Sequence, residues 1–230
     1  LTANFALNES FLGTAQLRSS VVSLATGIGY VPDTKTSAKA TVGVTLSLAG
    51  VSGRPSTVDL PRNHRFAATV DDVAYVFQTT DVHTAEDDGN GTYVFKTVDG
   101  SAVVPIYEGT RKAKTFLVGE FNEADVYMIP DISLDADSAL VTVTEGTTDT
   151  VFTNITAATT ISATSTIYIL KEAPNGFYQL SFGGNGILGL SPAAGSTITV
   201  DYISTKGATA NTATGFTATD TVTVLGTART

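Results

Sequence analysis

Apolar and polar residues alternate over many short stretches of this chain, the period expected of half-buried β-strands. The clearest example is 176–202, where two alternating runs, 178–182 and 198–202, flank a turn rich in glycine. Because glycine adopts positive φ and admits close contacts, four glycines in seven residues indicate a turn of defined shape. The pattern predicts a β-hairpin over 176–202.

A helical period occurs near the N-terminus. It predicts an amphipathic helix over residues 8–28, with Asn8 as N-cap and Pro32 preventing its continuation. Apolar residues follow one another from Leu17 to Ile28 at spacings of four, three and four. We expect this face to pack on the domain or on a neighbouring subunit. The candidate interface residues are Phe11, Leu17, Val21 and Leu24.

From Thr41 onward the period is two, beginning with a strand over 41–48 that Gly50 and Gly53 close. Short strands with Gly, Asp and Asn turns between them are typical of antiparallel sandwiches. We therefore predict a mainly β fold, with an N-terminal amphipathic helix followed by two small antiparallel β-sandwich-like modules. The expected parts are 1–40 (helix and linker), 41–108 (first module), 109–206 (second module, with the Gly-rich hairpin) and 207–230 (connector and final strand). The pattern leaves open whether the last strand, 221–225, returns to the first sheet.

The composition indicates a structural protein. Charged residues make up 15% of the chain, well under the roughly 25% typical of soluble domains. Much of the polar surface must therefore be Thr, Ser, Asn and Gly, which suits an all-β protein. The net charge of −9 argues against binding to nucleic-acid backbones or anionic membranes. There is no cysteine, which excludes disulfides and thiolate metal sites.

Few residues are candidates for chemistry. His64 and His83 are isolated, with no partner at metal-ligand spacing, so we expect surface or turn residues. A nucleophile elbow of the form G-x-S-x-G does not occur, although a Ser-His-Asp arrangement is spatial and spacing alone does not exclude it. We expect no catalytic, cofactor-binding or metal-binding residue.

Two acidic clusters invite comparison with cation sites. The run from Glu86 to Gly91 fails the EF-hand template, because a template started at Asp88 places Tyr93 where glycine is required. Its Asp-Gly and Asn-Gly pairs instead predict a hairpin turn. In the second cluster, Asp131, Asp135 and Asp137, the last two point the same way in an extended segment, so an ion is conceivable. We expect a solvated loop there.

The glycine-rich stretch resembles the signature of the J-like baseplate proteins of contractile-tailed phages. That signature is a strand ending in Phe-Gly, a loop of the form x-N/D-G-x-x-G-x-x-P-x-x-G, and a strand ending in Tyr. The matching residues are Phe182, Gly183, Asn185, Gly186, Gly189, Pro192, Gly195 and Tyr202.

The N-terminal stretch resembles the same family, in the helix pattern F-L-x-T-A-x-L-R-S-S-V followed by G-Y-x-P. The matches are Glu9, Phe11, Leu12, Thr14, Ala15, Leu17, Arg18, Gly29, Tyr30, Pro32, Ser37 and Ala38. The stretch around 103–116 resembles the family's passage from one β module to the next. The two longer matches lie about 150 residues apart in the order that the family shows them.

The resemblance implies a structural subunit of the baseplate wedge, most similar to the wedge proteins of T-even-type phages, with no enzymatic activity and no cofactor. In that family the subunits pair, join into a ring around the tail hub and pass the receptor-triggered rearrangement to the contractile sheath. The implied partners are other wedge subunits and a second copy in a dimer within the ring, with neither nucleic acid nor membrane. The implied location is the tail baseplate of the virion, after assembly in the host cytoplasm.

Since the chain begins at Leu1, we expect a fragment of a longer protein. Two other classes remain. A bacterial surface adhesin or stalk module would have an export signal upstream and no helix over 8–28. A carbohydrate-binding or hydrolytic tail module would have exposed aromatic residues or paired carboxylates in a groove.

Overall fold

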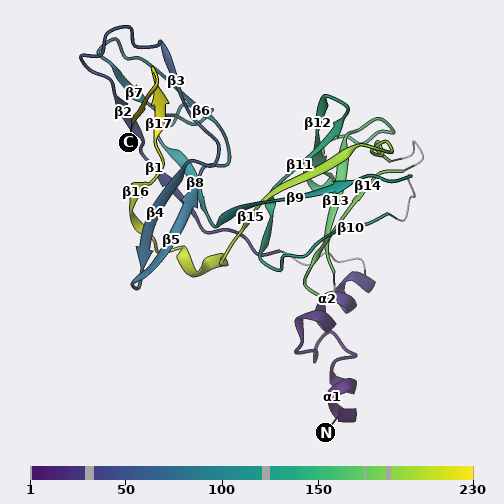
Figure 1. Cartoon of the computed structure of the whole chain (residues 1–230). Helices are drawn as coiled ribbons and strands as arrows, with labels where there is room; N and C mark the ends of the chain where they lie inside the picture. The colour runs from purple at the N-terminus through teal and green to yellow at the C-terminus, as the bar shows by residue number, and fades with distance from the viewer. Residues whose placement is uncertain (1, 29–33, 121–124, 174, 185–187, 230) are drawn as a thin grey trace. The chain divides into compact units, whose positions relative to one another are not determined.

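The computed structural model describes the chain except for residues 1, 29–33, 121–124, 174, 185–187 and 230 (Figure 1). Contacts divide the chain into two units. Unit 1 contains Leu1–Lys35 and Lys112–Ser204, and unit 2 contains Thr36–Arg111 and Thr205–Thr230. Each unit is therefore assembled from two separate stretches of sequence.

Unit 1 is built on a seven-stranded sheet in the order β10-β14-β13-β12-β11-β15-β9. The strands are β9 (Thr110–Leu117), β10 (Tyr127–Ile129), β11 (Leu134–Glu145), β12 (Thr148–Asn154), β13 (Ile167–Glu172), β14 (Tyr178–Phe182) and β15 (Thr197–Ser204). The first two residues of β9 belong to unit 2. β12 and β13 pair in parallel, joined by a connection that contains the 3-10 helix η1 (Ile155–Ala157). The inward residues, Ile129, Leu134, Val141, Leu180 and Ile198 among them, form the core of this unit.

The hairpin predicted over 176–202 is wrong. Its two alternating runs do form strands, β14 and β15, but three other strands of the sheet lie between them. β14 pairs with β10 and β13, while β15 pairs with the long strand β11. Alternation fixes which face of a strand is buried and leaves the neighbouring strand undetermined.

Unit 2 has a five-stranded sheet in the order β1-β8-β5-β4-β16. Its strands are β1 (Lys39–Val42), β4 (Arg65–Val70), β5 (Val73–Gln78), β8 (Val104–Glu108) and β16 (Thr214–Ala218). Three two-stranded sheets complete the unit: β2 (Thr45–Ser47) with β7 (Thr92–Val94), β3 (Thr57–Leu60) with β6 (His83–Glu86), and β17 (Val222–Val224) with β18 (Thr227–Arg229). The single strand expected over 41–48 is thus two strands, which pair with different partners.

The C-terminal stretch returns to unit 2. The strand expected at 221–225, whose return to the first sheet the sequence left open, is β17, which pairs with β18 in a separate two-stranded sheet and not with the five-stranded sheet. The chain passes from unit 1 to unit 2 after Ser204. A 3-10 helix, η2 (Gly207–Ala210), follows, and β16 then pairs antiparallel with β4. The ring of Phe216 packs edge-on against Phe77, with 4.9 Å between the ring centroids. Val224 on β17 is buried in the core of the same unit.

The helix predicted over 8–28 is also wrong as a single element. The structure has α1 (Thr2–Asn8) and α2 (Arg18–Gly27), drawn as separate purple helices in Figure 1, with a turn between them. The broader expectation, a mainly β chain with antiparallel sheets and a helical N-terminus, is confirmed. None of the helices in the described residues has the length and apolar character needed to cross a membrane.

Candidate functional site

The motif residues of the glycine-rich stretch divide between a half-buried strand end, a turn and a second strand. Phe182 ends β14, and its ring packs on those of Tyr127 and Phe152, with centroid distances of 6.0 and 5.2 Å. Pro192 and Tyr202 are buried. Asn185 and Gly186 lie outside the described residues.

Three motif glycines differ in what surrounds them. A Cβ at Gly183 would overlap the carbonyl group of Leu188. Gly189 has a φ of 74°, and a Cβ there would lie 2.6 Å from Cγ1 of Ile167. Gly195 also has positive φ, yet nothing lies within 4 Å of an added Cβ. The first two positions therefore exclude a side chain by contact, and the third disfavours one by conformation alone.

Tyr202 belongs to a polar cluster that reaches β9. Its hydroxyl donates to Oδ2 of Asp131 at 3.3 Å, and Nζ of Lys112 lies 2.7 Å from the same oxygen. Burial opposes ionisation of Asp131, but the hydrogen bonds from Lys112 and Ser133 outweigh it and hold its pKa below the ordinary value. Burial and the Asp131 charge raise the pKa of Tyr202 to about 12. The cluster ties the start of β9 to β15.

The solvated loop expected around the second acidic cluster is wrong. Asp131 and Asp135 are buried, whereas Asp137 is exposed. The register of β11 against β15 shifts between Asp135 and Leu140, so the two-residue alternation assumed for the cluster does not hold across it. No group of three or more His, Cys, Asp or Glu able to hold a metal ion occurs among the described residues.

Both histidines are buried, which corrects the expectation of surface residues, although His64 does end a turn in which its backbone N–H lies 3.4 Å from the Pro61 carbonyl oxygen. His64 packs edge-on against Phe66 with ring centroids 5.3 Å apart, and its Nδ1 makes no hydrogen bond. Burial lowers the pKa of His64, the nearby Asp220 opposing the effect. In β6, Nδ1 of His83 lies 3.4 Å from the Lys96 carbonyl oxygen. Each imidazole fills a place in the interior of unit 2.

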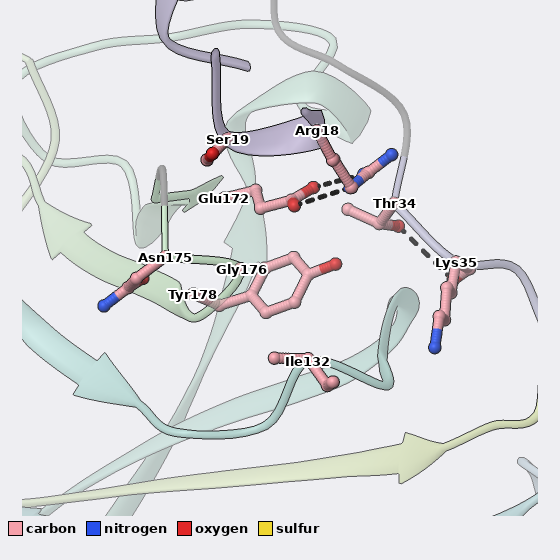
Figure 2. Close-up of a pocket in the computed structure, with 9 residues that line it drawn as sticks. All are labelled: Arg18, Ser19, Thr34, Lys35, Ile132, Glu172, Asn175, Gly176 and Tyr178. Atoms are coloured by element: carbon pink, nitrogen blue, oxygen red, sulfur yellow. Dashed lines mark hydrogen bonds and ion pairs between the residues drawn. The ribbon is translucent and has the colours of Figure 1, made fainter. Parts of the chain in front are cut away.

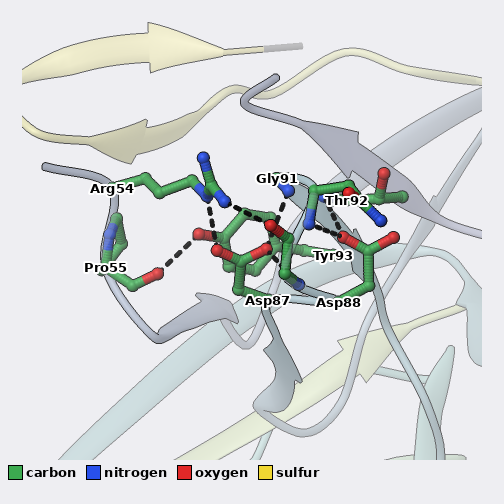
Figure 3. A network of polar contacts seen from close by, with 9 residues as sticks. Arg54, Pro55, Asp87, Asp88, Gly91, Thr92 and Tyr93 are labelled. Atoms are coloured by element: carbon green, nitrogen blue, oxygen red, sulfur yellow. Dashed lines mark hydrogen bonds and ion pairs between the residues drawn. The ribbon is translucent and has the colours of Figure 1, made fainter. Parts of the chain in front are cut away.

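The turn predicted over Glu86–Gly91 is present, and Figure 3 shows how it is held. An antiparallel bridge between Asp87 and Tyr93 closes it, whereas the flanking strands β6 and β7 pair in different two-stranded sheets. One oxygen of Asp87 accepts from the backbone N–H groups of Gly89 and Gly91, and Asp88 accepts from Asn90 and Thr92. Arg54 donates to the other Asp87 oxygen at 2.5 Å and to the Gly89 carbonyl at 2.7 Å. The hydrogen bond from Arg54, with the two backbone bonds, lowers the pKa of Asp87 against the effect of burial. The carboxylates of Asp87 and Asp88 thus stabilise the turn by accepting hydrogen bonds from its backbone.

The N-terminal segment, defined here as residues 2–28, bends at Glu9. The Glu9 carboxylate accepts from the backbone N–H groups of Gln16 at 2.8 Å and Leu17 at 3.2 Å, at the start of α2. Hydrogen bonds, first from Ser20 and then from Gln16, lower the pKa of Glu9. Glu9 therefore caps the second helix from a position outside it, rather than lying in the first turn of a longer helix.

α2 is joined to the sheet by an ion pair. Nε and Nη2 of Arg18 donate to the two oxygens of Glu172 at 2.9 and 2.5 Å (Figure 2). The Glu172 side chain, at the end of β13, is only 4% exposed, whereas that of Arg18 is 62% exposed. Two-point contact between a guanidinium and a carboxylate fixes orientation as well as distance.

This pair lies at a pocket of about 520 Å³. The pocket is lined by Arg18, Ser19, Thr34, Lys35, Ile132, Glu172, Asn175, Gly176 and Tyr178. Burial, and then the Glu172 charge, raise the pKa of Tyr178 to about 12, so its hydroxyl stays protonated at neutral pH. Arg18 and Glu172 are directed at each other, whereas Nζ of Lys35 donates to Ser133 at 3.3 Å. The Arg18–Glu172 pair serves to hold α2 on unit 1.

The predicted interface residues are distributed over the bent segment. Phe11, in the turn, is 60% exposed, and Leu17 is 49% exposed. Val21 and Leu24 are half-buried, while the neighbouring Val22 and Ala25 are fully buried. Sequence reasoning missed that Val22 and Ala25 form the inward side of α2, and it missed Glu172, whose partner is 154 residues away in the chain. Arg18, inside the matched helix pattern, was the available signal.

Together, the described residues form a mainly β protein of two units whose buried polar groups support the fold and whose N-terminal segment exposes apolar side chains. This combination is typical of a structural protein that assembles with others. No family model matches the chain. It is 32% identical over 239 residues to the baseplate wedge protein gp6 of Enterobacteria phage T4, over 96% of this chain. The chain spans about a third of the length of that relative, 34%.

Proposed function

We propose that this chain is a structural part of the baseplate wedge of a phage tail. The observation that carries the proposal is the likeness to a baseplate wedge protein along 96% of the chain. It supports the resemblance stated from the sequence, because a likeness over 96% of the chain is far longer than the motif stretches that carry that resemblance. The finer assignment to the J-like baseplate proteins, as a piece of a longer subunit, is part of the same proposal.

In this role the chain pairs with a second copy and joins other wedge subunits in a ring around the tail hub. The ring couples to contraction of the sheath, and assembly takes place in the host cytoplasm. Such a part needs stiff β units and contact area rather than catalysis. Exposed Phe11 and Leu17 support an interface on the N-terminal segment, since interface cores are depleted of charge and enriched in aromatic and apolar residues.

Quantitative mass spectrometry of purified tailed particles from the source tests this function. Two tryptic peptides suit the assay, TVDGSAVVPIYEGTR and SSVVSLATGIGYVPDTK. We expect both at one fixed, low ratio to a sheath protein in every preparation. Detection confined to the cell-envelope fraction would refute the baseplate function and favour the surface adhesin or stalk module.

A variant experiment tests the interface separately. Leu17→Asp and Val21→Asp should each reduce incorporation into particles, because each places a charge on the proposed contact face. Ser23→Asp is the matched control, since it adds the same charge to an exposed position of α2. Equal incorporation of all three variants would show that the N-terminal segment is not part of the interface, and it would not contradict the baseplate function.

A further inference from the structure

Strand β9 is exposed along almost its whole length. Of its eight residues, Thr110–Leu117, only Phe116 is half-buried, and the others are exposed, with Leu117 at 75%. A strand that covers a core normally alternates between buried and exposed residues. In β9 both faces are open, since Lys114 and Thr115 lie on opposite faces and each is exposed. β9 therefore contributes little to the core of unit 1.

β9 also lies at the end of the seven-stranded sheet, with β15 on one side of it and no strand of the described residues on the other. Directly after β9, Val118 donates its N–H to the carbonyl of Ser196 and accepts at its own carbonyl from the N–H of Gly195, each at 2.9 Å. Successive residues of a strand direct their backbone groups to opposite sides. The N–H and C=O groups of the odd-numbered residues in 113–117 therefore point away from β15.

The other edge strands of the two large sheets are shorter. β9 has eight residues, whereas β10, β1 and β16 have three, four and five. A free edge presents backbone donors and acceptors at a regular spacing, so the ligand that fits it is a second extended backbone. Among these four edges, β9 is therefore the one best suited to receive a strand from another chain.

The charge of β9 is opposite to that of the whole chain. The strand contains Arg111, Lys112 and Lys114 and no acidic residue, whereas the chain carries a net charge of −9. Opposite charges on neighbouring strands stabilise their pairing, and like charges directly opposite each other destabilise it. Two β9 strands would bring basic residues together, and β1, β10 and β16 contain no acidic residue. The edge therefore favours an acidic strand of a different protein over the edge strands that the large sheets of a second copy would offer.

The lysines of β9 leave its outer edge open. Edge strands often carry lysine as a protection against pairing with other chains. Here Nζ of Lys112 lies 2.7 Å from Oδ2 of Asp131, and Nζ of Lys114 lies 5.6 Å from the centre of the Phe116 ring. Both amines are thus held on the Phe116 face of the sheet. On that face, a carboxylate of an added strand would lie beside Lys114.

We propose that the outer edge of β9 is a docking surface for an extended acidic segment of another protein, which pairs with residues 113–117 as an added strand of the sheet. Main-chain hydrogen bonds supply the affinity, and carboxylates facing the basic residues of β9 select the partner. The geometry and charge of β9 support this surface whether or not the chain belongs to a baseplate.

The test uses the full chain and a peptide with blocked ends, TEVEVEVT, whose glutamates share one face when it is extended. Amide hydrogen exchange followed by NMR should slow by about tenfold or more at Ala113, Thr115 and Leu117 when the peptide saturates the chain. The matched peptide TKVKVKVT should give no such protection.

Variants separate main-chain pairing from charge. Ala113→Pro removes an outward N–H and no bond to β15, so it should weaken peptide binding by about fivefold or more. Ala113→Ser, the matched control, keeps that N–H and should weaken binding by less than about twofold. Lys114→Glu reverses the charge beside the added strand and should weaken binding by about threefold or more.

Unchanged exchange at the three amides with the acidic peptide at about 1 mM, or equal protection by the two peptides, would overturn the inference. Equal binding by folded Ala113→Pro and Ala113→Ser would also do so, and if Ala113→Pro does not fold, unchanged binding by Lys114→Glu refutes it instead. Protection that rises with chain concentration without any peptide would assign the edge to a second copy and refute the acidic partner. None of these measurements uses tail particles, so each result leaves the baseplate function to its own test.

Discussion

Replacing Gly189 with alanine tests whether the glycine-rich stretch is shaped by contact. The residue has a φ of 74°, and a Cβ would lie 2.6 Å from Cγ1 of Ile167 and 3.0 Å from the Ser165 carbonyl oxygen. A left-handed alanine costs about 1–2 kcal/mol, and forcing an extra carbon into a packed site costs about 1–3 kcal/mol more. We therefore expect Gly189→Ala to lower the free energy of unfolding by about 2–5 kcal/mol.

Gly195→Ala is the matched control, since Gly195 has a φ of 84° but no atom within 4 Å of an added Cβ. It should show the backbone cost alone, about 1–2 kcal/mol. Urea unfolding followed by far-UV circular dichroism and tyrosine fluorescence measures the difference. With a slope of about 2 kcal/mol per molar urea, an excess cost of 2 kcal/mol separates the midpoints by about 1 M. Coinciding midpoints would show that contact at Gly189 does not shape the turn.

Three further predictions concern buried polar groups. Arg18→Ala should lower the free energy of unfolding by about 2 kcal/mol in the same urea assay, because the buried carboxylate of Glu172 loses a two-point partner; an unchanged midpoint would contradict this. Because the folded pKa of Asp131 lies below its unfolded value near 3.8, its contribution to stability is complete above that pH and is lost as the pH falls through the folded pKa. Asp131→Asn should flatten this part of a stability-against-pH curve, and a curve of unchanged slope would count against the pairing with Lys112. The folded pKa of His64 lies below 6.5, so stability should decline as the pH falls below 6.5, and His64→Gln should remove that decline if protonation of this ring causes it.

Some features could be predicted because they depend on neighbouring residues. The alternation at 178–182 and 198–202 gave two true strands, and the Asp-Gly and Asn-Gly pairs gave a true turn between Glu86 and Gly91. The likeness across 96% of the chain to a baseplate wedge protein agrees with the resemblance found in the motif residues. The division into parts at 1–40, 41–108, 109–206 and 207–230 stays a prediction.

The N-terminal segment shows where local reasoning failed. Its period predicted one helix, and the structure has two, with the Glu9 carboxylate accepting from the backbone N–H groups of Gln16 and Leu17 directly before the second helix. A period records which residues would share a face if the helix were continuous. The period contains no information on whether a side chain such as that of Glu9 forms hydrogen bonds with the backbone in place of those of a continuous helix.

The sequence by itself determined the β class, most strand positions, the glycine turns and the low charge of the surface. Only the tertiary structure decided that β14 and β15 are separated by three strands, that the C-terminal stretch completes the sheet beside β4, and that Asp131 and His64 are buried. The physical reason is that a strand offers the same backbone donors and acceptors to any neighbour. Pairing and burial are therefore settled by contacts between residues far apart in the chain, which no local pattern records.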